Sequence, residues 1–516
     1  MIKKEDKIIV VGAGISGLST VIALVKKGYK DIHLFDKRNY IKQKYSYFDE
    51  CDSPSSDLNK FFRTAYGSEV YYQDMAIRSQ TVVRQWNKQI KEENWEGGDP
   101  ILIEKGNLFL TDNEELDEFG KATLKTRGDG KIIVLSDPRA REKAMAHGLD
   151  PCVADPFGLK KQGKTFQGII DVEAGNILAD KACRWMLYLA KRDGGSRLTL
   201  HLGKSIGEVD HLLEKCTSTG KKNVGICTKD GRSHYAPLTI VCAGPWLTEL
   251  VPESQEKVEA TAGSVALVKI TDPKLLAKYD ENKFPIWSWK TKDAGIAAVF
   301  GFPVSQGWMK IGFRGLKWTN PQPGLNSKII TKWSSPETET NIPLFALNSM
   351  KLVIKKFLPE IKKIDLTRMC WYGDTEDNNW LIDYSPYHED NSLFVVGGDS
   401  GHLFKMLAVI GDIIVDLLNN KGDTFLADLF SWSRKREKKN IINKGLDDPR
   451  ALQNVKMASP RIGTYLVIPS YDMIGSLIFL HPINSAVVVE YYLLIYILRT
   501  ACFTMFLKCF WISLLF

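Results

Sequence analysis

Three glycines near the N-terminus of this 516-residue chain have a spacing that can hold a phosphate group. Gly12, Gly14 and Gly17 form the pattern G-x-G-x-x-G directly after the apolar run Lys7–Val11. The first glycine permits a tight turn, the second lets a pyrophosphate approach the backbone, and the third allows close packing of a helix on a strand. Asp36 ends the next apolar run, where its carboxylate can accept hydrogen bonds from ribose hydroxyls. This combination predicts a dinucleotide site without a 2′-phosphate; the alternative is a glycine-rich turn that binds nothing.

A β-α-β unit must position these residues. Leu18, Val21, Ile22 and Val25 have helical spacing, Gly28 ends the helix, and Ile32–Phe35 is a second apolar strand. The start of such a helix presents free N–H groups and a partial positive charge to phosphates. Further cofactor contacts are expected at the helix start, after the second strand and in Cys242–Trp246: Ile15, Ser16, Lys37 and Gly244.

Several basic residues have positions that suit an anionic ligand. Lys60 and Arg63, in Asp57–Arg63, are three apart, which would place both on one side of a helical turn. They could neutralise a phosphate, a flavin carbonyl or a substrate carboxylate, or they could be surface charges. In the strand Trp308–Phe313, a period of two puts Lys310 opposite the apolar Met309 and its neighbours. Such a lysine either extends to solvent or faces a polar cavity.

Two further stretches carry a resemblance to a known family. They are Cys370-Trp-Tyr-Gly-Asp-Thr-Glu-Asp377 and Gly398-Asp-Ser-Gly-His-Leu-Phe-Lys405. A buried cysteine is ordinarily a small apolar residue. Together with the N-terminal unit, however, these stretches resemble the sarcosine oxidase and fructosyl-amino-acid oxidase family, especially its fungal branch with saccharopine and pipecolate oxidases. The resemblance runs from about Lys7 to about Ser459.

The resemblance implies a role for each matching residue. Cys370 would form a thioether to the 8α carbon of FAD, and Lys60 would lie against the flavin ring. Arg63 and Lys405 would bind the substrate carboxylate, and Lys310 would promote the reaction of reduced flavin with oxygen. Asp399 and Gly401 would also contact the cofactor.

The chain departs from the family pattern at four places. Gly373 stands where the family has threonine, Glu376 where it has proline, Leu403 where it has a small residue, and Ala408 where it often has proline. Leu403 would narrow the pocket or alter substrate choice. The first two departures lie beside Cys370 and weaken the prediction of a covalent flavin.

The resemblance implies an α/β fold: a Rossmann-type FAD-binding domain with a discontinuous, antiparallel-sheet substrate domain (α+β). We assign residues 1–90, 150–255 and 365–460 to the FAD-binding domain, and 91–149 and 256–364 to the substrate domain. Residues 461–516 form an apolar C-terminal extension. Strands and helices are expected at the following ranges: strands 106–110, 197–202, 238–241 and 393–396, helices 76–95, 177–192, 344–357 and 403–419, and a loop-rich stretch from 96 to 150.

Composition excludes several classes of protein. Hydrophobic residues make up 44% and charged residues 25%, as in globular proteins. The net charge of +8 is spread along the chain, which argues against nucleic-acid binding. The nine cysteines form no CxxC pairs, which fits a reducing compartment and indicates no metal site. The short segment before Lys7 leaves no room for a cleaved leader.

The C-terminal residues leave the location open. Residues 486–516 are nearly all apolar, but Glu490, Arg499 and Lys508 interrupt them. They are either a membrane anchor or an extension without function. The chain ends in Leu-Leu-Phe, not in the peroxisomal Ser-Lys-Leu type of tripeptide. We expect a monomer in the cytoplasm or the peroxisome.

The sequence thus predicts an FAD-dependent oxidase of secondary-amine amino acids that uses oxygen and yields hydrogen peroxide. Saccharopine, fructosyl amino acids, pipecolate and sarcosine are the expected types of substrate. Two alternatives stay open: an FAD-dependent amine dehydrogenase that passes electrons to another acceptor, and a flavoprotein without catalytic activity.

Overall fold

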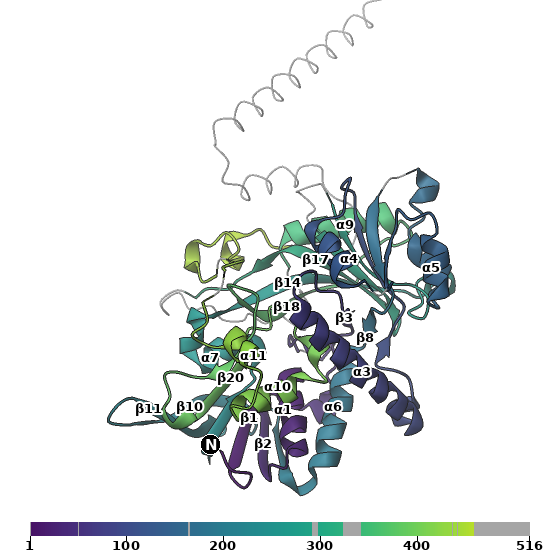
Figure 1. Cartoon of the computed structure of the whole chain (residues 1–516). Coiled ribbons are helices and arrows are strands. Elements are labelled where there is room, and N and C mark those ends of the chain that lie inside the picture. Colours follow the sequence, from purple (N-terminus) through teal and green to yellow (C-terminus); the bar gives the residue numbers. More distant parts are fainter. Residues whose placement is uncertain are drawn as a thin grey trace, which may run out of the picture. The chain divides into compact units, whose positions relative to one another are not determined.

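The structure is a computed structural model, and it describes residues 2–458 except 50, 129, 164–165, 292–297, 323–341, 436 and 441 (Figure 1). The apolar C-terminal residues 461–516 therefore lie outside the described residues. The hypothesis of a membrane anchor at 486–516 concerns the same undescribed residues. Among the helices that the structure does describe, none combines the length and the hydropathy that a bilayer crossing requires.

The glycine pattern lies at the end of the central strand of a parallel sheet. Within the described residues this sheet has six strands in the order β19-β20-β13-β1-β2-β9, parallel except for β19. Val10 of β1 is in register with Leu34 and Ile240, and all three are fully buried. Burial on both faces explains why these strands are apolar throughout. Their bounds are β1 (Lys7–Val11), β2 (Asp31–Asp36), β9 (Leu198–Leu202), β13 (Leu238–Val241), β19 (Leu381–Tyr384) and β20 (Leu393–Gly397).

Helices cover the parallel sheet. α1 packs against both α6 and α10, and Figure 1 shows the three beside β1 and β2. The helices have these bounds: α1 (Ile15–Lys26), α2 (Tyr40–Gln43), α3 (Val70–Glu92), α4 (Glu118–Thr126), α5 (Ala140–Ala146), α6 (Ala179–Gly194), α7 (Leu247–Leu250), α8 (Pro273–Lys278), α9 (Leu344–Phe357), α10 (Ile410–Leu418) and α11 (Thr424–Phe430).

A second, larger sheet carries Lys310 and Cys370. In the described part of the chain it has eight strands in the order β18-β14-β17-β16-β15-β5-β7-β6, antiparallel except for the pair β15 and β5. β14 runs through it between β17 and β18, and α9 packs on β14 and β17. The bounds are β5 (Asn107–Thr111), β6 (Ile132–Val134), β7 (Gln167–Asp171), β14 (Val258–Lys269), β15 (Ile286–Lys290), β16 (Ala298–Ser305), β17 (Trp308–Trp318) and β18 (Leu366–Thr375).

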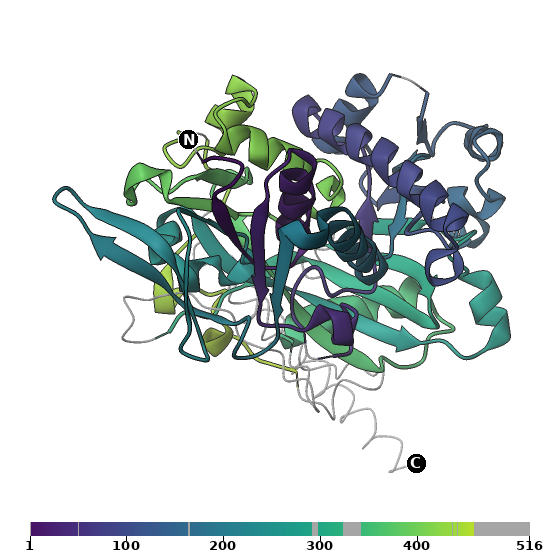
Figure 2. The same cartoon turned by 90° about the horizontal axis from the view of Figure 1, so that it is seen from below.

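Two small sheets complete the described strands. One has the order β3-β8-β4, and the other has the order β10-β11-β12. The hairpin of β10 and β11 projects from the edge of the molecule in both views (Figures 1 and 2). The bounds are β3 (Lys60–Phe62), β4 (Leu102–Ile103), β8 (Gly175–Ile177), β10 (Val209–Cys216), β11 (Lys221–Thr228) and β12 (Ser233–Tyr235).

Several sequence-based expectations were wrong at the level of single elements. The helical turn expected at Lys60–Arg63 is the strand β3, since Lys60 and Phe62 pair with β8. The stretch 96–150 contains α4 and α5, which its polar composition concealed. The helix expected over 403–419 is split into a 3-10 turn at Phe404–Met406 and α10.

Two strands from ranges assigned to the FAD-binding domain do not lie in the parallel sheet. β7 and β18 lie in ranges that we assigned to the FAD-binding domain, yet both pair within the eight-stranded sheet. Contacts cluster Met1–Val467 into one compact unit. The division into FAD-binding and substrate domains stays a prediction.

Candidate active site

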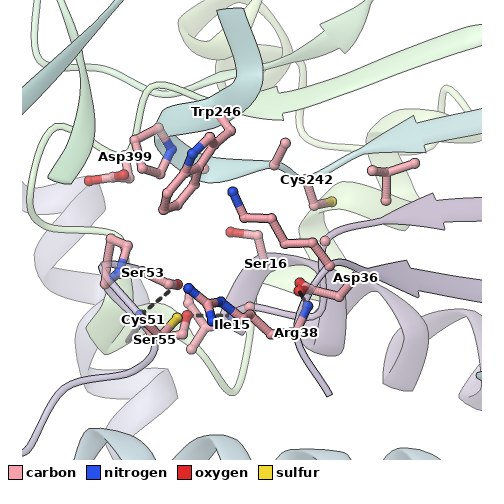
Figure 3. A pocket seen from close by; sticks show the side chains of 18 of the residues that line it. Ile15, Ser16, Asp36, Arg38, Cys51, Ser53, Ser55, Cys242, Trp246 and Asp399 are labelled. Carbon is pink, nitrogen blue, oxygen red and sulfur yellow. Dashed lines mark hydrogen bonds between the residues drawn. The ribbon is translucent and has the colours of Figure 1, made fainter. Parts of the chain in front are cut away.

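A pocket opens where β1 meets α1, at the carboxyl ends of the parallel strands (Figure 3). Such an edge is the usual ligand site of doubly wound sheets. Ten of the residues predicted to bind the cofactor line this pocket: Gly12, Gly14, Ile15, Ser16, Asp36, Lys37, Lys60, Gly244, Asp399 and Gly401. Leu403, one of the departures from the family pattern, lines it as well. Gly17 and Cys370 lie outside the lining.

The turn between β1 and α1 accepts only glycine at two positions. A Cβ atom on Gly12 would lie 2.3 Å from the carbonyl oxygen of Cys242, and the φ of Gly12 is +105°. A Cβ atom on Gly17 would lie 1.8 Å from the carbonyl oxygen of Gly12. Any larger residue would force the strand and the helix apart. Gly17 therefore does not line the pocket itself but allows α1 to pack closely against the turn that does.

Asp36 stands on one side of the pocket. Its Oδ2 atom accepts a hydrogen bond of 2.7 Å from the N–H of Ala13, and its Oδ1 atom accepts one of 2.8 Å from the N–H of Arg38. Burial raises the pKa of Asp36. A carboxylate has about four acceptor positions, so two stay open to a ribose. Lys37 lies 4.0 Å above the ring of Trp246 in the same pocket.

Asp399 stands on the opposite side of the pocket (Figure 3). Its oxygens accept hydrogen bonds of 2.8 Å from the N–H of Gly401 and 3.2 Å from the N–H of Gly373. Burial raises the pKa of Asp399 to about 6. The family has threonine at position 373, but the backbone N–H that the glycine offers is common to all residues.

A buried carboxylate joins two of the predicted lysines. Asp57 accepts hydrogen bonds from Lys310 at 2.7 Å and from Lys60 at 2.8 Å, one on each oxygen. Lys310 also donates to the carbonyl oxygen of Asn59 at 2.6 Å, and its Nζ atom lies 4.8 Å from the ring centroid of Phe302. Lys310 is thus buried against a polar partner and does not extend to solvent. The period of two was right, because Met309 lies in the core on the other face.

The pKa values in this cluster follow from burial and charge. Burial lowers the pKa of Lys310, and the negative charge of Asp57 offsets only part of this effect. For Lys60, burial acts in the same direction and is the largest single influence, but the hydrogen bond to Asp57 and the charges of Asp57, Cys370 and Asp399 together outweigh it, so the pKa is raised. For Asp57, burial alone would raise the pKa, but the charges of the two lysines lower it overall.

Cys370 lies beside this cluster on β18, in register with Gly263 of β14. Burial and the charge of Asp57 raise the pKa of its thiol, while Lys310 and Lys60 act in the opposite direction. Because Tyr372 is two residues further along the strand, it has the same face as Cys370. Tyr372 lines the cofactor pocket, so Cys370 faces the same side of the sheet.

Arg63 and Lys405 form a second basic cluster. The Nη1 atom of Arg63 donates to the carbonyl oxygen of Ala65. Lys405 donates to the Tyr66 hydroxyl and to the carbonyl oxygen of His402, both at 2.9 Å. Burial and the positive charges of Arg63 and Arg314 lower the pKa of Lys405 well below its usual value. Burial and the positive charge of Arg314 lower the pKa of Arg63 to about 10. Among the described residues, neither cation has a carboxylate within ion-pair distance.

Comparisons with known proteins identify the family of this chain. The model of the family described as FAD dependent oxidoreductase matches residues 7–417. L-Saccharopine oxidase of Schizosaccharomyces pombe is 26% identical over 436 residues, which are 82% of this chain and 92% of that protein. N-Methyl-L-tryptophan oxidase of Escherichia coli is 25% identical over 378 residues, 73% of this chain and 87% of that protein.

Solved structures share the fold. Fructosamine oxidase (Amadoriase II) of Aspergillus fumigatus superimposes with a TM-score of 0.63 at 22% identity, covering 84% of this chain and 91% of that chain. A modified fructosyl peptide oxidase from Aspergillus nidulans gives a TM-score of 0.69 at 22% identity, covering 88% and 99%. These likenesses confirm the predicted fold class.

This chain belongs to the FAD-dependent oxidoreductase family. Its own residues fit the cofactor, because the pocket combines a turn that only glycine can form, the N-terminus of α1 and a carboxylate at the end of β2. Residues Gly12–Ser16 would hold the pyrophosphate, Asp36 the adenosine ribose, and Lys60, Asp399 and Gly401 the opposite part of the cofactor.

Two residues of the site of this oxidoreductase were not predicted from the sequence. Asp57 begins the basic stretch Asp57–Arg63 and pairs with both Lys60 and Lys310. Tyr66, which connects Lys405 with His402 through hydrogen bonds, had no signal in the sequence.

Proposed function

We propose that this oxidoreductase is an oxidase of secondary-amine amino acids. The observation that carries the proposal is the pair of cations formed by the half-buried Arg63 and the buried Lys405, whose hydrogen bonds within the described part of the chain go only to neutral oxygens. The relatives from Schizosaccharomyces pombe and Escherichia coli are named for substrates that combine a carboxylate with a secondary amine. FAD, when bound, would supply the redox chemistry: it accepts the two electrons that the substrate loses as CH–NH becomes C=N, and oxygen takes these electrons and two protons to become hydrogen peroxide.

Arg63 and Lys405 would orient the substrate. A carboxylate beside them would restore the charge balance of the buried site and accept charge-assisted hydrogen bonds. With the carboxylate held, the neighbouring secondary amine and its α carbon have a fixed position. The resulting imine would hydrolyse in water. No side chain is needed as a general base if the amine binds in its neutral form.

Lys310 would serve the reaction with oxygen. Oxygen reduction develops negative charge, and a nearby buried cation stabilises that charge more strongly than water does. The short contacts of Lys310 with Asp57 and Asn59 hold its ammonium group in place, which is what an electrostatic role requires. Asp57 would therefore be a positioning residue.

Cys370 would hold the cofactor covalently through a thioether to its 8α carbon. In support, Cys370 shares a strand face with Tyr372, which lines the cofactor pocket. Such a bond would prevent loss of the cofactor. A monomer in the cytoplasm or the peroxisome stays our expectation.

The decisive experiment is a substrate panel on the purified, flavin-loaded protein. Saccharopine, fructosyl amino acids, pipecolate and sarcosine are each mixed with the enzyme without oxygen, and the loss of flavin colour is followed. Peroxide is then measured in air. If the protein is an oxidase, at least one of these compounds bleaches the flavin and peroxide is released in air. The decarboxylated analogue of that compound should react far more slowly.

Two other results would change the conclusion. Bleaching without peroxide in air would indicate a dehydrogenase that uses another acceptor. Failure of every secondary amine to bleach the flavin would indicate a flavoprotein without this activity.

A further inference from the structure

Tyr66 contacts both of the cations that would bind the substrate. The guanidinium carbon of Arg63 lies 5.3 Å from the centroid of the Tyr66 ring, and the Nζ atom of Lys405 lies 5.1 Å from it. Cations at these distances are attracted to the electron-rich face of an aromatic ring. Because Tyr66 is buried in the core, its ring has a fixed position. One buried side chain therefore links Arg63 and Lys405.

His402 fixes the direction in which the Tyr66 hydroxyl donates. The Nε2 atom of His402 lies 2.9 Å from the carbonyl oxygen of Asn378, which can only accept, so the ring hydrogen is on Nε2. Burial lowers the pKa of His402 to about 3, so near neutral pH its ring is uncharged and its Nδ1 atom is an acceptor. The Tyr66 hydroxyl lies 3.3 Å from Nδ1 and 3.5 Å from the carbonyl oxygen of the same histidine. Its hydrogen is therefore directed to His402.

Lys405 meets the oxygen of the same hydroxyl. Since the hydrogen of Tyr66 is directed to His402, its oxygen accepts the hydrogen bond of 2.9 Å from Lys405. A second N–H of Lys405 donates to the carbonyl oxygen of His402, also at 2.9 Å. An ammonium group has three N–H groups at tetrahedral angles, so two fixed acceptors also fix the direction of the third. Within the described part of the chain, this third N–H is the one left for a ligand.

Aromatic rings hold His402 in this orientation. Its ring lies edge-on to that of Tyr72, at 4.7 Å between centroids, and 5.2 Å from the ring of Trp380. Both neighbours are almost fully buried. The hydroxyl of Tyr72 donates to Asn379 at 3.0 Å and takes no part in the hydrogen bonds that lead to Lys405. Packing thus sets the orientation of His402 without any ligand.

We propose that Tyr66 and His402 are positioning residues, which hold Lys405 so that its third N–H meets the substrate carboxylate. His402 acts on Tyr66 and Tyr66 acts on Lys405, because each hydrogen bond fixes the direction of the next one. Neither Tyr66 nor His402 needs to touch the carboxylate. This inference rests on the proposed binding of a carboxylate by Arg63 and Lys405, and it adds the residues that prepare this site.

The test measures the affinity for a carboxylate without any oxidation. Butanoate has the chain length of N-methylglycine with a methylene group in place of the nitrogen, and butanamide is its uncharged counterpart. Calorimetric titration of the flavin-loaded protein gives a dissociation constant for each. In Tyr66→Phe we expect butanoate to bind about 10-fold more weakly, since a hydrogen bond to a charged group is lost. The affinity for butanamide should stay the same.

Two variants of His402 test the order of action. His402→Leu removes the acceptor of the Tyr66 hydrogen and should weaken the binding of butanoate by a similar factor. His402→Asn keeps an oxygen acceptor near the position of Nδ1 and should restore most of the affinity. Because His402 acts through Tyr66, the double variant with Tyr66→Phe and His402→Leu should bind butanoate no more weakly than Tyr66→Phe alone.

The matched control is Tyr72→Phe, which keeps the ring but removes a buried hydroxyl from the same aromatic cluster. It should leave the affinity for butanoate unchanged. The inference is overturned if Tyr66→Phe keeps the affinity of the unchanged protein, or if Tyr72→Phe loses as much as Tyr66→Phe. Additive losses in the double variant would overturn it as well, because His402 would then act independently of Tyr66.

The titration separates this inference from the oxidase proposal. If no compound of the substrate panel bleaches the flavin but the butanoate affinities follow the expected pattern, the positioning role stands and the oxidase proposal fails. If butanoate does not bind to the unchanged protein, the positioning role is overturned, whether or not a secondary amine bleaches the flavin.

Discussion

The ammonium group of Lys310 lies 2.7 Å from the Oδ1 atom of Asp57, and both side chains are only 3% exposed. The same carboxylate pairs with Lys60 through its other oxygen, at 2.8 Å. One buried anion therefore balances two cations. A buried charge without a partner is strongly destabilising. Loss of Asp57 would leave both lysines without a carboxylate, whereas loss of one lysine would leave Asp57 paired with the other.

This inequality predicts different stabilities for two variants. Asp57→Asn would leave the buried Lys310 and the half-buried Lys60 without a carboxylate partner and should lower the free energy of unfolding by about 3–5 kcal/mol. Lys310→Met should cost less, because Asp57 keeps Lys60 as its partner. Denaturant unfolding of both flavin-loaded variants measures the difference. Equal losses would contradict the view that Asp57 carries the charge balance.

Lys310→Met should also separate the two halves of the catalytic cycle. Without a buried cation near the site of oxygen reduction, we expect the reoxidation of reduced flavin to slow by about 100-fold or more. Bleaching by substrate without oxygen should change far less, because it does not need this charge. Stopped-flow absorbance measures both rates.

Lys269→Met, which removes an exposed lysine at the end of β14, is the control for the oxygen experiment. It should leave both rates near those of the unchanged protein. An unaltered rate of reoxidation in Lys310→Met would exclude Lys310 from the reaction with oxygen.

Cys370→Ala tests the covalent bond. When the unchanged protein is precipitated with acid, the yellow colour should stay in the pellet, and in Cys370→Ala it should pass into the supernatant. Cys51→Ala is the matched control, since Cys51 lines the pocket itself, and its pellet should stay yellow. Free flavin from the unchanged protein would refute the thioether.

Lys405→Met should make the empty protein more stable while it impairs binding. Burial and the charges of Arg63 and Arg314 disfavour the charged form of Lys405, which lowers its pKa. An apolar side chain of similar length removes this strain, and we expect a gain of about 1 kcal/mol in the free energy of unfolding. The half-saturating substrate concentration should rise by about 10-fold or more. A less stable variant would contradict the electrostatic account.

The raised pKa of Asp399 should make the stability of the protein depend on pH. Its pKa is about 6 in the folded protein, above the ordinary value of 3.8 for an aspartic acid. Between these values the folded protein holds a proton that the unfolded chain has lost, so the free energy of unfolding falls as the pH rises. The contribution is complete below about pH 4 and is lost as the pH passes about 6, at most about 3 kcal/mol.

Asp399→Asn removes this titration. The difference in unfolding free energy between the variant and the unchanged protein should therefore grow in favour of the variant from pH 4 to pH 6. Both proteins are compared without flavin by denaturant unfolding across this range. Parallel curves would show that Asp399 does not titrate as described.

The sequence by itself determined the nucleotide-binding unit. Gly12, Gly14 and Gly17 follow a strand and open a helix, and local sterics allow little else at Gly12 and Gly17. The alternation in β17 also predicted the face of Lys310, because a strand has a fixed period of two. These features depend on neighbours within about 30 residues in the chain, which is why a single sequence shows them.

Only the tertiary structure decided how the basic residues are used. Lys310 meets Asp57 although 253 residues separate them, because the fold brings β17 of the eight-stranded sheet beside the residues that precede β3. Lys60 lies in the strand β3 and Arg63 follows the end of that strand, so the two are not on one side of a helix, since pairing with β8 overrides the local spacing. Lys310 and Lys60 meet a carboxylate, whereas Lys405 meets only neutral oxygens among the described residues. This difference depends on such distant contacts and not on any local pattern.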